Sequence, residues 1–232
     1  MAVRRLLDDG ALADSSVVAN CMMNRERSLS GSNGYGRELG IDVMAELDGR
    51  AKASTPVRWL DVCCGSGRAP AEAAGLLAGR SLAAQAEITG LDLVDHFVPG
   101  PFPPFLRLVS GSVVDWVPDA RFDLITCVHG LHYVGDKLGA LSRIASWLTA
   151  DGLFVANFDA RSVRPADGAS TGLRLTAQLR AQGFAYDSAR RRVSRRGHGE
   201  VRFPYRYLGA DDHAGPNYTG QPAVDSFYEP LP

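Results

Sequence analysis

The stretch Trp59-Leu-Asp-Val-Cys-Cys-Gly-Ser-Gly-Arg68 decides the fold of this chain. Its apolar start predicts a buried strand, an acid stands near the tip of that strand, and two glycines precede an alanine-rich helical run. A glycine turn between a strand and a helix lets a ligand approach backbone N–H groups at the helix N-terminus. A turn that binds pyrophosphate would avoid the negative charge of Asp61, which instead suits a ligand that carries a cation.

The composition indicates an ordinary globular protein. The chain has 232 residues, of which 45% are hydrophobic and 22% charged, enough for one domain with a full core or for a domain with short extensions. A formal net charge of −1 gives no general attraction to nucleic acid or to an anionic membrane. The sequence has no run of about 18 apolar residues and no signal-peptide core after Met-Ala-Val-Arg-Arg, so we expect a cytoplasmic protein.

The cysteines predict neither a disulfide framework nor a metal site. Two of the four, Cys63 and Cys64, are adjacent, and Cys127 lies in an apolar run. Neither arrangement has the spacing of a zinc site.

Strand-like and helix-like segments alternate from about residue 57 onward. The pattern predicts strands at residues 57–63, 86–93, 105–113, 122–128 and 153–158, and helices at residues 69–84 and 136–148. Repeated units of this kind are typical of a parallel sheet with helices on both faces. The proline-rich stretch 94–104 excludes a normal crossover helix and predicts a loop.

The two ends of the chain follow different patterns. Residues 1–55 predict helices around 6–23 and 37–51, joined by a glycine-rich link. After residue 158, the pattern predicts a helix at 171–182 and two strands at 185–194 and 200–207, joined by Arg-Gly-His-Gly. The last segment, 209–232, holds glycine, proline and aromatic residues without periodicity and predicts an irregular tail.

The turn and the order of segments resemble class I S-adenosylmethionine-dependent methyltransferases, whose first motif usually reads Asp-x-Gly-x-Gly-x-Gly here. Cys63 stands where that family has its first glycine. The resemblance covers about residues 57–208 and implies an α/β fold, with a Rossmann-like, mostly parallel seven-stranded sheet and an antiparallel last strand. It implies an N-terminal helical cap at 1–55 that shapes the acceptor pocket and a methyltransferase core at 56–208. The tail at 209–232 is expected to be a lid, an interface arm or a disordered segment.

The resemblance implies S-adenosylmethionine as the cofactor. Asp61 would accept a hydrogen bond from the methionine ammonium, directly or through water, and Asp92 would bind the ribose hydroxyls. Ser112 and Val113 would contact the adenine. The other residues assigned to the cofactor are Cys63, Gly65, Gly67, Leu93, Val128 and, for the methionine carboxylate, Tyr35 and Arg37. A solvated helix start is an equal alternative for Tyr35 and Arg37. The turn lacks the Gly-x-Gly-x-x-Gly pattern that a nicotinamide cofactor requires.

The acceptor of a methyl group is expected over the tips of the fourth and fifth strands in such a fold. Thr126-Cys-Val-His-Gly-Leu-His-Tyr133 follows the fourth strand there. A histidine can remove the acceptor proton at neutral pH, so His129 is the first candidate for a base and His132 the second, with Tyr133 positioning the acceptor. A purely packing role for either histidine stays open, and no metal is predicted because nearby carboxylates are lacking.

We expect a small-molecule acceptor in specialised biosynthesis, with a phenolic or enolic oxygen favoured over carbon or nitrogen. The chain lacks the Asn/Asp-Pro-Pro-Tyr/Phe motif of many amino methyltransferases. Two alternatives remain: an RNA or protein methyltransferase that uses the arginines between residues 190 and 196, and a methyltransferase-like protein that binds the cofactor without methyl transfer. Aromatic residues of the tail would line the acceptor pocket or pack against a second subunit of a homodimer.

Overall fold

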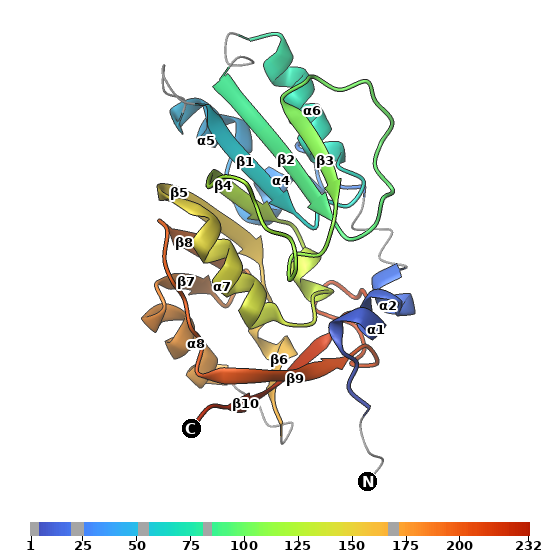
Figure 1. Ribbon diagram of the computed structural model, residues 1–232, viewed down its shortest axis with the longest axis vertical. Coiled ribbons are helices and arrows are strands. Elements are labelled where there is room, and N and C mark those ends of the chain that lie inside the picture. The colour runs from blue at the N-terminus through green and yellow to red at the C-terminus, as the bar shows by residue number, and fades with distance from the viewer. Residues whose placement is uncertain (1–4, 20–25, 51–55, 81–84, 167–171) are drawn as a thin grey trace.

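A seven-stranded sheet forms the centre of the molecule (Figure 1). The computed structural model describes residues 5–19, 26–50, 56–80, 85–166 and 172–232. The strand order is β3-β2-β1-β4-β5-β8-β7. The bounds of these strands are β1 Val57–Val62, β2 Ala86–Asp92, β3 Leu106–Ser110, β4 Phe122–Cys127, β5 Leu148–Asn157, β7 Phe184–Asp187 and β8 Arg192–Arg196. The first five strands pair in parallel and β8 runs antiparallel to both neighbours, which confirms the predicted fold class.

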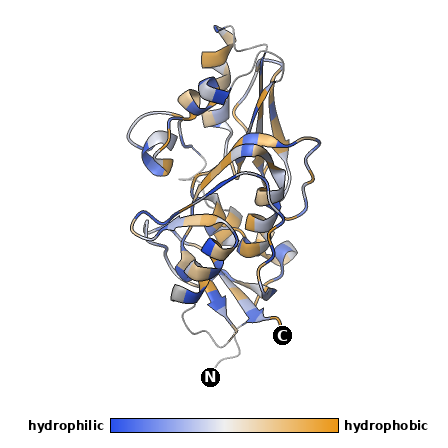
Figure 2. Cartoon of the chain, turned by 90° about the vertical axis from the view of Figure 1, so that its left-hand side faces the viewer, coloured by the Kyte–Doolittle hydropathy of each residue, from blue (hydrophilic) through white to orange (hydrophobic). Residues whose placement is uncertain are grey.

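Helices cover both faces of this sheet because successive strand residues point to opposite sides. Trp59 and Leu124 pack with α4 (Tyr35–Leu39), α5 (Val43–Arg50) and α6 (Arg68–Ala78) on one face. Leu60 and Ile125 pack with α7 (Lys137–Trp147) and α8 (Gly172–Ala181) on the other. The strands are accordingly rich in hydrophobic residues (Figure 2). Among the described residues, no helix is long and apolar enough to cross a membrane.

The N-terminal helices are shorter than predicted. The segment expected at 6–23 contains α1 (Asp9–Ala13) and α2 (Ser16–Ala19), and part of it lies outside the described residues. The segment expected at 37–51 is divided into α4 and α5, because Gly40 adopts φ +68° and ends α4. The helix expected at 69–84 ends at Ala78, before Gly79, and residues 81–84 also lie outside the described part.

The turn of the hairpin predicted at the end of the core was placed wrongly. The chain reverses at residues 188–191, inside the segment predicted as one strand, and not at Arg-Gly-His-Gly. The side chain of Asp187 accepts hydrogen bonds from the backbone N–H groups of Ala189 and Arg190, which stabilises a turn there. Arg191 adopts φ +47°, which completes the reversal into β8.

The C-terminal segment is irregular only in part, whereas the sequence prediction gave it no regular element. The strand expected at 200–207 is β9 (Tyr205–Asp211), which pairs with β10 (Asp225–Pro230) rather than with the large sheet. Together with β6 (Val163–Pro165) they form a three-stranded sheet of order β6-β10-β9. The residues between β9 and β10 form a loop, called here the C-terminal loop (residues 212–224).

Lys137 fixes this small sheet to the core. Its side chain is fully buried, and Nζ donates to the carbonyl oxygens of Val134 (3.0 Å) and Val224 (2.7 Å) and to Ser226 Oγ (2.9 Å). Three acceptors match the three protons of an ammonium group. The end of the C-terminal loop is therefore held against the core.

The proline-rich stretch 94–104 contains no helix, as predicted. It has no regular secondary structure, and the N–H group of Val98 donates to the carbonyl oxygen of Ser66 at 2.8 Å. This contact ties the stretch to the glycine turn after β1.

Candidate functional site

A cleft lies at the carboxyl ends of β1, β2 and β4, where parallel α/β sheets bind ligands. Residues of α1 also line the cleft, together with Gly111 and Gly130. It brings together seven of the residues predicted for the cofactor, which are Cys63, Gly65, Asp92, Leu93, Ser112, Val113 and Val128. Tyr133 also lines this cleft, whereas His129 and His132 do not.

The glycine turn is compact in spite of its cysteine. Cys63, Gly65 and Gly67 have φ values of +54°, +63° and +72°, all in the left-handed region that favours glycine. Gly130 lies directly against the cysteine, since a Cβ atom added at Gly130 would be 2.1 Å from Cys63 Cβ. The side chain that replaces the usual glycine at position 63 is thus accommodated by a glycine at position 130.

Asp92 stands at the end of β2 and lines the cleft. Its Oδ2 accepts from the N–H group of Gly65 at 2.8 Å, and its Oδ1 accepts from the N–H group of Val94 at 3.1 Å. Each carboxylate oxygen can accept more than one hydrogen bond, so the group can hold the turn and still bind a ligand hydroxyl. This is the position that the sequence predicted for the ribose.

Asp61 lies behind the turn and not in the cleft. It is fully buried, and its two oxygens accept from the hydroxyls of Tyr35 and Thr126, both at 2.6 Å. Thr126 Oγ1 in turn accepts from Trp59 Nε1 at 2.9 Å. Burial raises the pKa of Asp61 to about 7, although its two side-chain hydrogen bonds act in the opposite direction.

Three further residues predicted for the cofactor lie outside the lining of the cleft. Tyr35 is buried against Trp59 and bound to Asp61. Arg37 Nη1 donates to the carbonyl oxygen of Ser32 and lines a separate groove. Gly67 precedes the first residue of α6. The geometry gives no direct contact between the cleft and Asp61, Tyr35 or Arg37.

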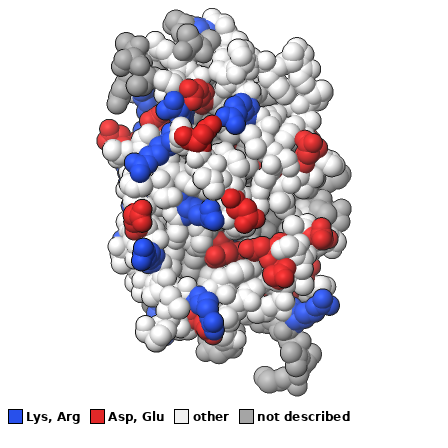
Figure 3. Space-filling model, in the orientation of Figure 1, with Lys and Arg blue, Asp and Glu red and all other residues white. Residues whose placement is uncertain are grey.

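The charge of the cleft is negative. Asp9, Asp92 and Asp115 line it, and its described lining contains no lysine, arginine or histidine. Acidic side chains gather beside α1 on this side of the molecule (Figure 3). Burial, followed by the charge of Asp136, raises the pKa of Asp9. A low-dielectric cleft lined by one sign of charge attracts a ligand of the opposite sign.

Two buried histidines follow the tip of β4. His129 adopts φ +57°, and its Nε2 lies 2.9 Å from Glu38 Oε2. This contact is the largest factor that lowers the pKa of Glu38. The rings of His129 and His132 are 5.5 Å apart, and Tyr218 of the C-terminal loop packs against both. His129 Nδ1 and His132 Nε2 are buried and have no hydrogen-bond partner among the described residues.

His132 lines a second cavity, called here the chamber, which lies between the end of β5, β6 and the C-terminal loop. Burial, followed by the charges of His129 and Lys137, lowers the pKa of His132 well below its ordinary value. The imidazole is therefore neutral at pH 7, with a lone pair on one of its ring nitrogens. Gly130 and Tyr133 line the cleft while His132 lines the chamber, so residues around this single helical turn contribute to both cavities.

The sequence prediction missed Glu38, Asn217 and the role of Thr126. Glu38 meets His129 across 91 positions of the chain and Thr126 meets Asp61 across 65, and no local pattern marks either contact. Asn217 lies in the segment predicted as irregular. The available signal for Thr126 was its hydroxyl at the tip of a buried strand, next to the strand that carries Asp61.

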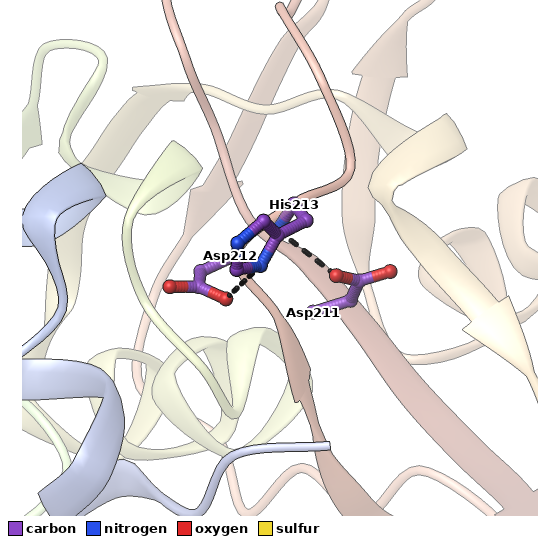
Figure 4. Close-up of side chains that lie close together, drawn as sticks. All are labelled: Asp211, Asp212 and His213. Atoms are coloured by element: carbon purple, nitrogen blue, oxygen red, sulfur yellow. Dashed lines mark hydrogen bonds and ion pairs between the residues drawn. The ribbon is translucent and has the colours of Figure 1, made fainter. Parts of the chain in front are cut away.

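Asp211, Asp212 and His213 also lie close together, at the end of β9 (Figure 4). They are consecutive residues and they bind each other. His213 Nδ1 is 2.8 Å from Asp212 Oδ1, and the N–H group of His213 donates to Asp211 Oδ1. Because the imidazole is exposed and its neighbours in the chain supply these contacts, we assign no metal to this group.

Comparison with known proteins agrees with this geometry. A family model described as a methyltransferase domain matches residues 35–197, which is most of the chain. No curated protein matches the sequence significantly. Among solved structures, CalS10, an amino pentose methyltransferase from Micromonospora echinaspora, is 23% identical, with 50% of this chain and 46% of that chain covered and a TM-score of 0.36.

Two further solved structures have similar TM-scores. The plantazolicin methyltransferase BpumL with S-adenosyl-homocysteine (SAH) is 16% identical, with coverages of 49% and 44% and a TM-score of 0.39. The N-methyltransferase NodS from Bradyrhizobium japonicum WM9 is 13% identical, with coverages of 73% and 94% and a TM-score of 0.40. The chain thus matches less than half of the length of CalS10 and BpumL. On the family match, the chain belongs to the class I S-adenosylmethionine-dependent methyltransferases, and S-adenosylmethionine is its cofactor.

Proposed function

We propose that this methyltransferase binds S-adenosylmethionine in the cleft and methylates a small molecule that is presented from the chamber. When bound, the cofactor supplies a methyl group that its sulfonium makes electrophilic. The negative lining of the cleft suits this cation, and Asp92 would bind the ribose. Ser112 and Val113 would contact the adenine, and Asp61 would act through its charge from behind the turn.

His132 carries the proposal for the acceptor. It is 1% exposed, neutral, and has an unpartnered Nε2 on the cavity next to the cleft. A neutral imidazole in this place can take the proton that an acceptor loses on methylation. This favours an acceptor with a dissociable proton, a phenolic or enolic oxygen first, with carbon and nitrogen as alternatives.

His129 would position His132 and the acceptor. When its Nε2–H donates to Glu38, the tautomer is fixed and Nδ1 is left as an acceptor. We place His132 before His129 as the base because His132 lines the chamber and His129 does not. Specialised biosynthesis and a cytoplasmic location remain part of this proposal.

The arginines near β8 support a small-molecule acceptor over RNA or a protein. Arg190 pairs with Asp187 and Arg191 with Asp159, both at 2.9 Å. Arg192 and Arg195 donate to backbone carbonyl oxygens. Arg191, Arg192 and Arg195 thus use their guanidinium groups in part-buried contacts and form a poor surface for phosphates.

A turnover assay tests this proposal. The protein would be incubated with S-adenosylmethionine and panels of phenols, enols and amines, and S-adenosylhomocysteine would be measured by mass spectrometry. We expect turnover with a hydroxyl acceptor, and we expect His132→Asn to lower kcat by about 10²- to 10⁴-fold without changing cofactor affinity.

The matched control is His96→Asn, because His96 is exposed and lies outside both cavities. Full turnover by His132→Asn would contradict the role of His132. Cofactor binding without turnover on any panel would favour the alternative of a binding protein without methyl transfer.

A further inference from the structure

We infer that the methyl acceptor carries an oxyanion, a carboxylate or a phosphate, and that the chamber binds it through Arg161 and Asn217. This inference rests on the proposed function, because it assigns a chemical class to the substrate of that site. It is carried by the charges of the chamber, by its unpartnered polar atoms and by the loop that lines one side of it.

The chamber has one guanidinium more than its carboxylates can pair. Arg191 pairs with Asp159 and Arg164 with Asp225, both at 2.9 Å. Arg161 lines the same cavity, and its guanidinium makes no ion pair or hydrogen bond with the described residues. The described lining thus has three arginines against two aspartates, so an anion entering the chamber meets an unpaired positive charge.

The buried polar atoms without a partner in the lining suit a ligand that accepts hydrogen bonds. Asn217 Oδ1 accepts from the backbone N–H group of Thr219 at 2.7 Å and from its hydroxyl at 2.6 Å. These two donors fix the orientation of the amide, so the buried, unpartnered atom is the Nδ2 donor. His132 Nε2 is the second such atom in the lining and can donate or accept.

Buried polar groups in folded proteins nearly always have a partner. Asn217 Nδ2 is a buried donor without a partner on the same cavity as an unpaired guanidinium, and it therefore points to a ligand that supplies oxygen atoms, while His132 Nε2 stays the acceptor that its role as base requires. A carboxylate or phosphate offers several acceptor oxygens to such a set of donors, and a neutral apolar acceptor would leave the donors unpaired.

The C-terminal loop lines one side of the chamber, beside these donors. Within the loop, a bridge joins Pro216 and Pro222, and the N–H group of Asn217 donates to the carbonyl oxygen of Gln221 at 2.7 Å. Tyr218 stacks under the guanidinium of Arg191 at 4.4 Å and meets the ring of His132 at 5.3 Å. An oxyanion held by Arg161 and Asn217 would thus keep the rest of the acceptor beside His132, one helical turn from the cleft.

Histidine NMR detects occupancy of the chamber directly. The five histidines give a simple long-range ¹H–¹⁵N spectrum, in which His132→Asn identifies the signal of His132. Inorganic phosphate and acetate serve as minimal oxyanions, and chloride at equal ionic strength serves as the reference. We expect phosphate or acetate to shift the His132 signal in a saturable way and chloride not to do so.

Variants locate the site. We expect Arg161→Ala to raise the Kd of the effective oxyanion at least fivefold and Asn217→Ala at least threefold. Arg180→Ala removes an exposed arginine of α8 outside the chamber and should leave the Kd unchanged. Saturation by phosphate alone indicates a phosphorylated acceptor, and saturation by acetate indicates a carboxylate. The absence of a saturable shift with either anion, or an unchanged Kd in Arg161→Ala, would overturn the inference.

Calorimetry with S-adenosylmethionine on the same samples separates this inference from the proposed function. Cofactor binding without an anion response would overturn the inference and leave the proposed function standing. An anion response without cofactor binding would remove the proposed function and leave an oxyanion site.

Discussion

Replacing Asp61 with asparagine should weaken cofactor binding and remove a proton release that accompanies it. Asp61 is fully buried and bound by Tyr35 and Thr126, and its pKa is raised to about 7, chiefly by burial. At pH 6 about nine-tenths of these carboxyls are therefore protonated. A cation bound on the other side of the turn would favour the ionised form, so binding should release up to about 0.9 proton per chain.

The pKa sets an upper limit to this coupling. Lowering it from about 7 to the ordinary value of 3.8 corresponds to ~4 kcal/mol. A quarter to a half of that amount, ~1–2 kcal/mol, corresponds to a loss of affinity of about 5- to 30-fold. We expect Asp61→Asn to show a loss in this range at pH 8, where the wild-type carboxyl is mostly ionised.

Titration calorimetry at pH 6 in two buffers of different ionisation enthalpy measures the proton release. At that pH an α-amino group such as that of the cofactor is already protonated and contributes little. Asp9→Asn is the control, because Asp9 also lines the cleft with a raised pKa. The release should persist in Asp9→Asn and vanish in Asp61→Asn. Equal affinity and equal proton release in wild type and Asp61→Asn would show that Asp61 does not sense the cofactor.

The same raised pKa predicts a pH dependence of folding. The folded chain keeps the Asp61 proton up to about pH 7, whereas the unfolded chain loses it near pH 3.8. The folded state thus binds more protons between these values, and Asp61 lowers the free energy of unfolding as pH rises through this window. Urea unfolding at pH 5 and pH 8 should show a smaller decrease for Asp61→Asn than for wild type.

Three further substitutions have defined outcomes. Gly130→Ala should abolish cofactor binding and destabilise the fold by more than ~2 kcal/mol, because its Cβ would overlap Cys63. A Cβ at Gly75 meets no atom within 4 Å, so Gly75→Ala should stabilise α6 by ~0.5–1 kcal/mol in urea unfolding. Lys137→Met should lower the free energy of unfolding by ~2–4 kcal/mol, since it leaves three buried acceptors unpaired; an unchanged urea midpoint would contradict this role. Glu38→Gln should lower kcat about tenfold or more with unchanged cofactor affinity in steady-state kinetics, because His129 loses the carboxylate that orients it.

The sequence was sufficient for the core of the fold because its signals are local. Alternating strand and helix patterns and the turn at Trp59–Arg68 each lie within a short window, and the large sheet follows from their order. The cleft is lined by Asp92, Ser112 and Val113, which stand at or after the carboxyl ends of their strands. These residues come together because the carboxyl ends of parallel strands meet at one edge of the sheet.

The remaining features depend on contacts between distant segments. The three-stranded sheet could not be predicted, because β10 pairs with β6 more than 60 positions earlier and neither segment alternates clearly. Lys137 finds Val224 and Ser226 across 87 and 89 positions, a contact that no pattern around the lysine reveals. The turn after β7 was missed because the side chain of Asp187, and not a glycine, stabilises it.

Titration of the wild-type protein and of Asp92→Asn with S-adenosylmethionine provides the decisive comparison. We predict binding at a single site per chain in wild type, a loss of at least about tenfold in Asp92→Asn from the ribose hydrogen bonds, and no change in Arg37→Ala, whose side chain lies outside the cleft. The absence of binding in wild type, or equal affinities of wild type and Asp92→Asn, would contradict the placement of the cofactor in this cleft.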